Sequence, residues 1–203
     1  MKEHPILFSG AMVRALLAGA KTQTRRAVKP QPTHFNPAGV PRRIVPDGGP
    51  SEVIRCPYGQ PGDRLWVREH WRAPQSVDHL PPRSISDSEA RRFIADEVVG
   101  PDAGFGKARR AFHMPRWASR ITLEITGVRV ERLQDISEAD ALAEGVTPKW
   151  EPGCSGRLME AFSGFSFRPA ASAYADLWEQ INGPGSWDAN PWVWAVEFRR
   201  VEG

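Results

Sequence analysis

Cysteine is scarce in this sequence: Cys56 and Cys154 are the only two among 203 residues, and no CxxC pair occurs. A disulfide scaffold needs more cysteines and a zinc ribbon needs closely spaced pairs, so the sequence excludes both. The five histidines show neither HxH nor HExxH spacing. We therefore predict no metal site and interpret the two cysteines as reduced thiols.

Long hydrophobic runs and a strong charge of either sign are also absent. No stretch approaches the ~18 consecutive apolar residues of a membrane helix, and the N-terminal residues lack the pattern of a signal peptide. With 27 basic and 24 acidic residues, the formal net charge is only +3. We expect a soluble, cytoplasmic protein with no membrane partner. Its mild basic bias permits a nucleic-acid partner without requiring one.

Proline and glycine are abundant, with 19 and 18 residues, and the chain has eight tryptophans. Such a composition predicts long loops. Two segments rich in these residues and in serine, about 74–112 and 147–171, are interpreted as insertions in a single domain of residues 1–203. The first insertion carries one weak helical pattern, near residues 88–98.

Apolar residues at helical spacing predict short helices in MVRALLAGA, SEADALAEG and SAYADLWEQING. In the second of these, Ser137 is the expected N-cap and Asp140 completes a capping box three residues later. Gly145 is the expected C-terminal stop of the same helix.

The segment TQTRRAV has no helical stripe and is interpreted as an extended strand, and alternating apolar residues predict strands in RLWVRE, ITLEITGVRV and PWVWAVEF. Asp63 is expected to cap the turn before the second strand, and Gly127 is expected to break the third, as a bulge would. On the last strand we assign Trp192 and Trp194 to the core. The fold class that follows is α+β, mainly β: a small mixed β-barrel with two or three short helices and long loop insertions.

The segment GAKTQTRR, residues 19–26, holds the first candidate site residues. Lys21 is followed by Thr24, whose hydroxyl becomes a nucleophile only when a neighbouring base takes its proton. A lysine serves as that base only if desolvation lowers its pKa. In a regular strand the two side chains would face opposite sides, so the pair requires a turn of the chain at Lys21. From the spacing alone, a structural or phosphate-contact role is the alternative and the more common one.

Glu144 is the next candidate, in the last turn of the helix predicted for SEADALAEG. A carboxylate there faces the negative end of the helix dipole, which is unfavourable by about 0.3–1 kcal/mol. Such a group holds its proton longer, as a general acid or base would. A solvated glutamate on the helix surface is the alternative.

The order of these motifs resembles the ASCH domain, a family with a PUA-like β-barrel fold, and most closely the ASCH proteins of bacteriophages and prophages. The resemblance rests on GAKTQTRR, PGDRLWVRE, the long alternating strand, SEADALAEGV and the Trp-rich closing strand. It covers about residues 4–73 and 113–201. PUA-like folds bind RNA or modified bases, and small bacterial ASCH proteins include amidohydrolases that remove acyl groups from the exocyclic amine of cytidine.

This resemblance implies a catalytic site of Lys21, Thr24 and Glu144 that uses no metal and no cofactor. Lys21 would activate Thr24 or hold an oxyanion, Thr24 would attack an amide carbonyl or position water, and Glu144 would pass a proton to the leaving amine. Side chains that contact phosphate or stack on a base are expected around the cleft: Arg25, Arg26, Trp66, Trp71, Arg116 and Trp117. For Arg25 and Arg26, pairing with local carboxylates is the alternative.

Three functions remain open at this point: an amidohydrolase acting on acylated cytidine or a related nucleobase, a non-catalytic module that binds RNA or a modified base, and a ribonuclease using the same cleft. The expected partner is a modified nucleoside, RNA or another single-stranded nucleic acid; the sequence does not determine the oligomeric state. If the chain is an amidohydrolase, we expect Lys21→Ala and Glu144→Ala each to abolish hydrolysis and to leave the fold intact.

Overall fold

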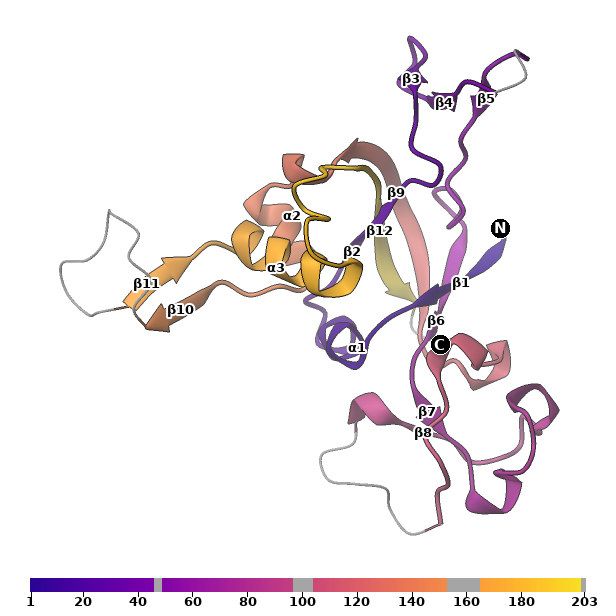
Figure 1. The fold of residues 1–203 in the computed structure, drawn as a ribbon. Coiled ribbons are helices and arrows are strands. Elements are labelled where there is room, and N and C mark those ends of the chain that lie inside the picture. Colours follow the sequence, from indigo (N-terminus) through magenta and orange to yellow (C-terminus); the bar gives the residue numbers. More distant parts are fainter. Residues whose placement is uncertain (46–48, 97–103, 153–164, 202–203) are drawn as a thin grey trace. The chain divides into compact units, whose positions relative to one another are not determined.

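The computed structural model describes residues 1–45, 49–96, 104–152 and 165–201. Within these ranges the fold is α+β and mainly β, as predicted, with three α-helices and several sheets (Figure 1). No closed barrel is detected among the described residues. No helix in the same ranges is long and apolar enough to cross a membrane.

The largest sheet has five strands in the order β1-β6-β9-β12-β2. The bounds of these strands are β1 Glu3–Leu7, β6 Arg64–Arg68, β9 Thr122–Arg132, β12 Trp192–Val201 and β2 Gln23–Ala27. All four strands expected from the sequence are therefore present. β1 is an addition that the sequence pattern did not indicate.

The chain divides into two compact units. Unit 1 comprises Met1–Gly19, Pro57–Gly127 and Glu197–Gly203, and unit 2 comprises Ala20–Cys56 and Val128–Val196. The chain passes from one unit to the other within β9 and again within β12.

In unit 1, β1 pairs in parallel with β6, and β6 pairs antiparallel with β9. Helix α1 (Gly10–Leu17) begins at the N-cap Ser9, whose hydroxyl accepts a hydrogen bond from the backbone N–H of Met12. Asp63 caps the turn before β6 as predicted: its carboxylate accepts hydrogen bonds from the backbone N–H of Gln60 at 3.3 Å and of Lys2 at 2.7 Å.

Strand β9 runs without interruption through Gly127, so the expected break is wrong. A Cβ atom at this position would lie 2.7 Å from Oε2 of Glu197. Because Oε2 is the far end of a flexible side chain and can move aside, this contact does not by itself require glycine at position 127.

Strand β7 (Trp71–Arg72), just before the insertion expected at 74–112, pairs with β8 (Arg92–Phe93) inside it, and the insertion also holds several single turns of 3₁₀-helix. The weak helix expected near residues 88–98 does not form up to residue 96, so the prediction is wrong for that part of the chain. There the chain forms β8 and the 3₁₀ turn η3 (Ile94–Asp96), since the backbone of Phe93 pairs with that of Trp71. Residues 97 and 98 lie outside the described ranges.

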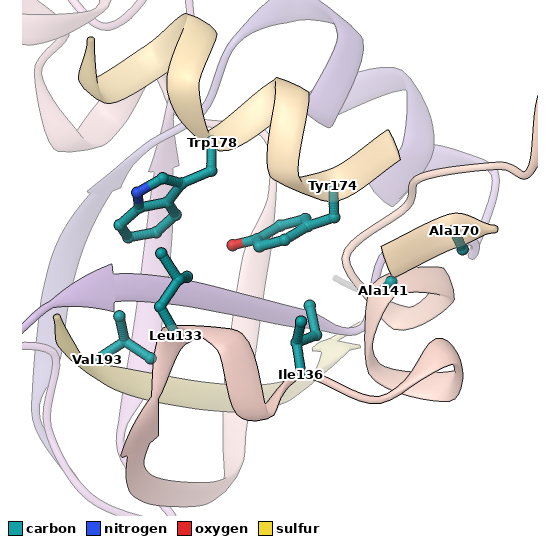
Figure 2. Packing of buried hydrophobic residues seen from close by; sticks show 7 residues of the cluster. All are labelled: Leu133, Ile136, Ala141, Ala170, Tyr174, Trp178 and Val193. Atoms are coloured by element: carbon teal, nitrogen blue, oxygen red, sulfur yellow. The ribbon is translucent and has the colours of Figure 1, made fainter. Parts of the chain in front are cut away.

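Unit 2 contains helices α2 (Glu138–Ala143) and α3 (Ala170–Asn182), both at predicted positions. Figure 2 shows Tyr174 and Trp178 of α3 directed towards Leu133 and Ile136. The cluster also includes Ala141, Ala170 and Val193. This apolar core holds α3 against the segment that leads into α2. Ile181, which the pattern assigned to the same face of α3, is 54% exposed.

Two small sheets complete unit 2. Strands β3 (His34–Phe35), β4 (Pro41–Arg43) and β5 (Glu52–Val53) form one, and β10 (Lys149–Pro152) pairs antiparallel with β11 (Phe165–Arg168) in the other. The second hairpin occupies the insertion expected at 147–171. The residues between its strands, including Cys154, lie outside the described ranges.

The core assignment on β12 is confirmed for Trp194, which is buried together with Val193 and Ala195. Both faces of the strand are therefore covered at this point. Trp192 is half-buried; its ring lies 4.4 Å from that of Phe35, and the guanidinium of Arg132 lies 4.4 Å above it.

Candidate functional site

Lys21 and Glu144 are brought together by backbone pairing within unit 2. The two residues form an isolated antiparallel bridge, and the N–H of Thr22 donates to the carbonyl of Ala143 at 2.8 Å. Gly19, with a φ of +73°, lets the chain turn after α1, as the candidate pair requires. The end of a helix and the start of a strand thereby meet across 123 positions of sequence.

The carboxyl end of α2 holds Glu144 in place. Glu144 is the C-cap, and Gly145 follows with a φ of +84°. The N–H of Gly145 donates to the carbonyl of Leu142 at 2.8 Å, and the N–H of Val146 donates to that of Ala141 at 3.3 Å. These two bonds make a Schellman motif, which fixes the direction of the chain on both sides of Glu144.

Gly145→Ala is expected to lower the free energy of unfolding by about 1–2 kcal/mol, because a left-handed backbone costs an L-residue roughly that much. Denaturant unfolding measures the change. Gly10→Ala is the matched control: it lies at the start of α1, and its new Cβ would find the nearest heavy atom at 3.5 Å. If both variants unfold like the wild type, the left-handed cap does not stabilise the site.

The ammonium group of Lys21 is fully buried and has three acceptors. Nζ donates to Oε2 of Glu144 at 2.8 Å, to the backbone carbonyl of Glu144 at 2.9 Å and to that of Gln23 at 2.8 Å. Burial lowers the pKa of Lys21, and the charge of Glu144 only partly opposes this. Desolvation, the condition for a lysine to act as a base, is therefore met.

Arg25 lies buried among three carboxylates. Its guanidinium contacts Glu131 at 2.5 Å, Asp140 at 3.3 Å and Glu144 at 3.4 Å. Of the two roles expected for Arg25, pairing with local carboxylates is therefore the one observed. Arg26 is half-buried and donates to the backbone carbonyl of Arg25 at 3.2 Å.

Asp140 joins the capping box of α2 to this cluster. Its carboxylate forms the box with Ser137, accepts a hydrogen bond from Gln23 at 3.2 Å and pairs with Arg129 at 2.7 Å. Burial raises the pKa of Asp140, but the bonds from Ser137 and Gln23 and the charge of Arg25 outweigh it, so the pKa lies well below its usual value. The sequence identified Asp140 only as a cap.

Thr24 is also fully buried, and its hydroxyl has no hydrogen-bond partner among the described residues. The structure therefore places Thr24 in the same strand segment as Arg25 but does not join its Oγ1 to Lys21 or Glu144. A buried polar group without a partner costs about 1–3 kcal/mol. A catalytic role is one explanation for such a group, and six other residues in the described ranges also have a buried polar side-chain atom without a partner.

Tyr174 is a further contact of Glu144 that the sequence assigned only to the core of α3. Burial raises the pKa of the Tyr174 phenol well above its ordinary value, and the charge of Glu144 and a hydrogen bond with it add to this. The phenol therefore stays protonated and donates to the carboxylate. The sequence pattern placed Tyr174 on the apolar face of the helix and did not indicate its contact with Glu144.

A pocket of about 310 Å³ lies in unit 2, beginning one residue after Glu144. Its lining residues come from the chain after α2, from the end of β11 and from one face of α3: Gly145, Val146, Thr147, Arg168, Ala173, Asp176, Leu177 and Gln180. Arg168 and Asp176 form an ion pair at 2.5 Å. The pocket is thus mixed in character, with apolar walls and one charged pair.

The remaining predicted substrate-binding residues belong to unit 1. Trp66 is buried, with the guanidinium of Arg68 at 4.5 Å from its ring, and Arg116 forms a two-bond ion pair with Glu3. Trp117 is half-buried and meets Trp71 edge to face at 5.8 Å.

Trp71 itself is 0% exposed and packs with Ala73, Ile85 and Met114. Its ring offers no face to a base, so the structure does not support the stacking role expected for Trp71. Large, deeply buried aromatic rings fill cores, and this is what Trp71 does in unit 1.

In the part of the chain that the structure describes, no three His, Cys, Asp or Glu side chains are grouped as a metal site would need.

Comparison with protein-family models, with curated proteins and with solved structures found no match to this chain. What the site does is therefore inferred from its own residues and their geometry.

Proposed function

We propose that the chain is a metal-independent amidohydrolase on an ASCH-type, PUA-like fold, and that it removes acyl groups from modified cytidine or a related nucleobase. The observation that carries this proposal is the Lys21–Glu144 contact, 2.8 Å between Nζ and Oε2 with both side chains buried. A buried lysine with a lowered pKa, in hydrogen-bond contact with a carboxylate, forms a pair that could accept a proton and pass it on.

Amide hydrolysis needs a nucleophile, a group that takes its proton and a group that protonates the leaving amine. In the proposed reaction Oγ1 of Thr24 attacks the acyl carbonyl, and its proton passes to the Lys21–Glu144 pair. The pair then gives this proton to the exocyclic amine as the carbon–nitrogen bond breaks. Water hydrolyses the acyl-threonine, which returns the hydroxyl and releases the carboxylic acid.

Tyr174 and Arg25 hold Glu144 in this scheme. The phenol and the guanidinium both approach its carboxylate, so Glu144 keeps one orientation while its charge changes. Since the three proposed catalytic side chains are buried, the substrate must displace part of their cover. The pocket lined in part by Gly145 has the size of a small-molecule site, but Lys21, Thr24 and Glu144 are not among the residues that line it.

A binding module without chemistry is the second candidate, and one observation favours it. Each hydrogen of the Lys21 ammonium already has an acceptor, and Thr24 has no hydrogen bond to a base. A hydrogen-bond network in which every lysine hydrogen has an acceptor is as consistent with a structural role as with a catalytic one. In that case the PUA-like fold would hold RNA or a modified base.

The test is a chromatographic assay of the purified chain with N4-acylated cytidines, beside unmodified RNA and single-stranded DNA. We expect release of cytidine and the free acid, unchanged by a metal chelator. Cut RNA with intact acylcytidine would instead indicate a ribonuclease, the third function that the sequence leaves open. If no substrate is consumed, the binding module is the candidate function that remains.

The choice of inactive variant follows from burial. Lys21→Ala removes one partner of a buried ion pair, which typically costs 3–5 kcal/mol, and Glu144→Ala does the same from the other side. We therefore expect both variants to be destabilised, which revises the expectation from the sequence that they leave the fold intact. Thr24→Val keeps the shape of the side chain and all charges, so it is the control for the assay.

A further inference from the structure

An exposed phenylalanine stands out on unit 1. Phe112 is 65% exposed, although its neighbour Ala111 and the nearby Met114 are buried. The three residues Ala111–His113 form a single 3₁₀ turn, whose backbone is anchored by the buried residues Ala111 and Met114. The ring of His113 meets that of Phe112 edge to face at 5.3 Å. The result is an aromatic pair facing solvent.

Two arginines accompany this pair. Nη1 of Arg68 donates to the backbone carbonyl of Phe112 at 3.2 Å, and Arg110 is exposed at the position before the turn. Neither guanidinium forms an ion pair with an acidic side chain in the described residues, and that of Arg68 lies over the ring of Trp66 at 4.5 Å. In this they differ from two neighbours along the chain, since Arg109 pairs with Asp78 and Arg116 pairs with Glu3. The charge beside Phe112 is therefore not neutralised locally.

We propose that Arg68, Arg110, Phe112 and His113 form a surface, here called the aromatic–basic surface, that binds single-stranded nucleic acid. An unpaired base stacks on the exposed face of Phe112, and the phosphates on either side contact Arg68 and Arg110. Stacking platforms beside positive charge bind single strands with little sequence preference, because every base has a π-face. A duplex keeps its bases stacked and gives Phe112 nothing to bind.

This inference is independent of the proposed hydrolysis, since none of its residues belongs to the Lys21 site. It is tested by titrating the full chain into a labelled oligouridylate and its DNA equivalent, with fluorescence anisotropy as the readout. Phe112→Ala is expected to weaken binding roughly 5- to 100-fold, the loss of one stacked base. Phe112→Trp is expected to restore it.

Arg110→Gln is expected to weaken binding and to lower the slope of log K against log salt by about 0.7, the value for one phosphate contact on a single strand. Phe112→Ala should leave that slope unchanged. Ile181→Ala, at an apolar side chain of unit 2 that is also exposed, serves as the control and should bind like the wild type.

Three results would overturn the proposal. One is unchanged affinity in Phe112→Ala. Another is equal or tighter binding of a duplex of the same length. The third is binding of an acidic peptide with the same dependence on Phe112, which would make the surface a protein-docking site.

Discussion

Arg25→Met is expected to lower the free energy of unfolding by about 3–5 kcal/mol, the typical cost of removing one partner from a buried set of charges. The guanidinium is fully buried and contacts Glu131, Asp140 and Glu144. Methionine fills much of the same volume, so the loss measures charge and hydrogen bonding more than packing. Urea unfolding at neutral pH gives the value.

Arg43→Met is the matched control for this variant. Arg43 pairs with Glu52 at 2.6 Å, a distance close to that of the Arg25–Glu131 contact, but the two side chains are 42% and 53% exposed. An exposed pair contributes only about 0.2–1 kcal/mol, because water solvates both charges and salt screens them. Equal losses of unfolding free energy in the two variants would show that the burial of Arg25 adds nothing to the stabilisation by its ion pairs.

The pH dependence of the same variant identifies the carboxylates involved. Asp140 has a pKa lowered in the folded state, so its stabilisation is present above its unfolded pKa of about 3.9 and is lost as pH falls through the folded value. Arg25 is one cause of this lowering. The unfolded chains of Arg25→Met and the wild type titrate alike, so the stability difference between them should stay constant until the pH falls to the lowered folded-state pKa of Asp140, and should shrink only there. A difference that already shrinks between about pH 5 and pH 3 would assign it to carboxylates other than Asp140.

Local signals in the sequence predicted local structure well. Ser137, Asp140 and Gly145 specify both ends of α2 because each acts within four residues of its partner. Alternation predicted β6, β9 and β12 for the same reason, since side-chain direction follows from backbone geometry alone. The extended run Thr22–Val28 gave β2, but nothing in it indicated which strand β2 would pair with.

The charge cluster could not be predicted in this way. Arg25 meets Glu131 across 106 positions of sequence and Glu144 across 119, and such distances have no periodic signal. The meeting of Lys21 and Glu144 was expected only through the ASCH resemblance. The burial of Trp71 could not be predicted either. The composition shows that tryptophans are numerous, but only packing in the folded chain decides which ring faces solvent.

Thr24→Val is expected to abolish hydrolysis of acylated cytidine while the protein becomes more stable. The hydroxyl is buried without a partner, and replacing it by a methyl group removes a desolvation cost of about 1–3 kcal/mol. If Thr24 attacks the substrate or positions water, its loss lowers the rate by at least about 100-fold, the lower end of what a positioned group in proton transfer contributes. Turnover of acylcytidine and urea unfolding measure the two effects on the same sample.

Opposite changes in activity and stability separate a functional threonine from a structural one. Thr22→Val, at an exposed position in the same segment, is the control and should change unfolding by less than about 0.5 kcal/mol and leave turnover intact. Thr24→Ser keeps the hydroxyl and should retain measurable activity. A Thr24→Val protein that is more stable and fully active would remove Thr24 from the mechanism. One that is less stable would show that the hydroxyl has a partner in solution, and its burial would then be explained by structure alone.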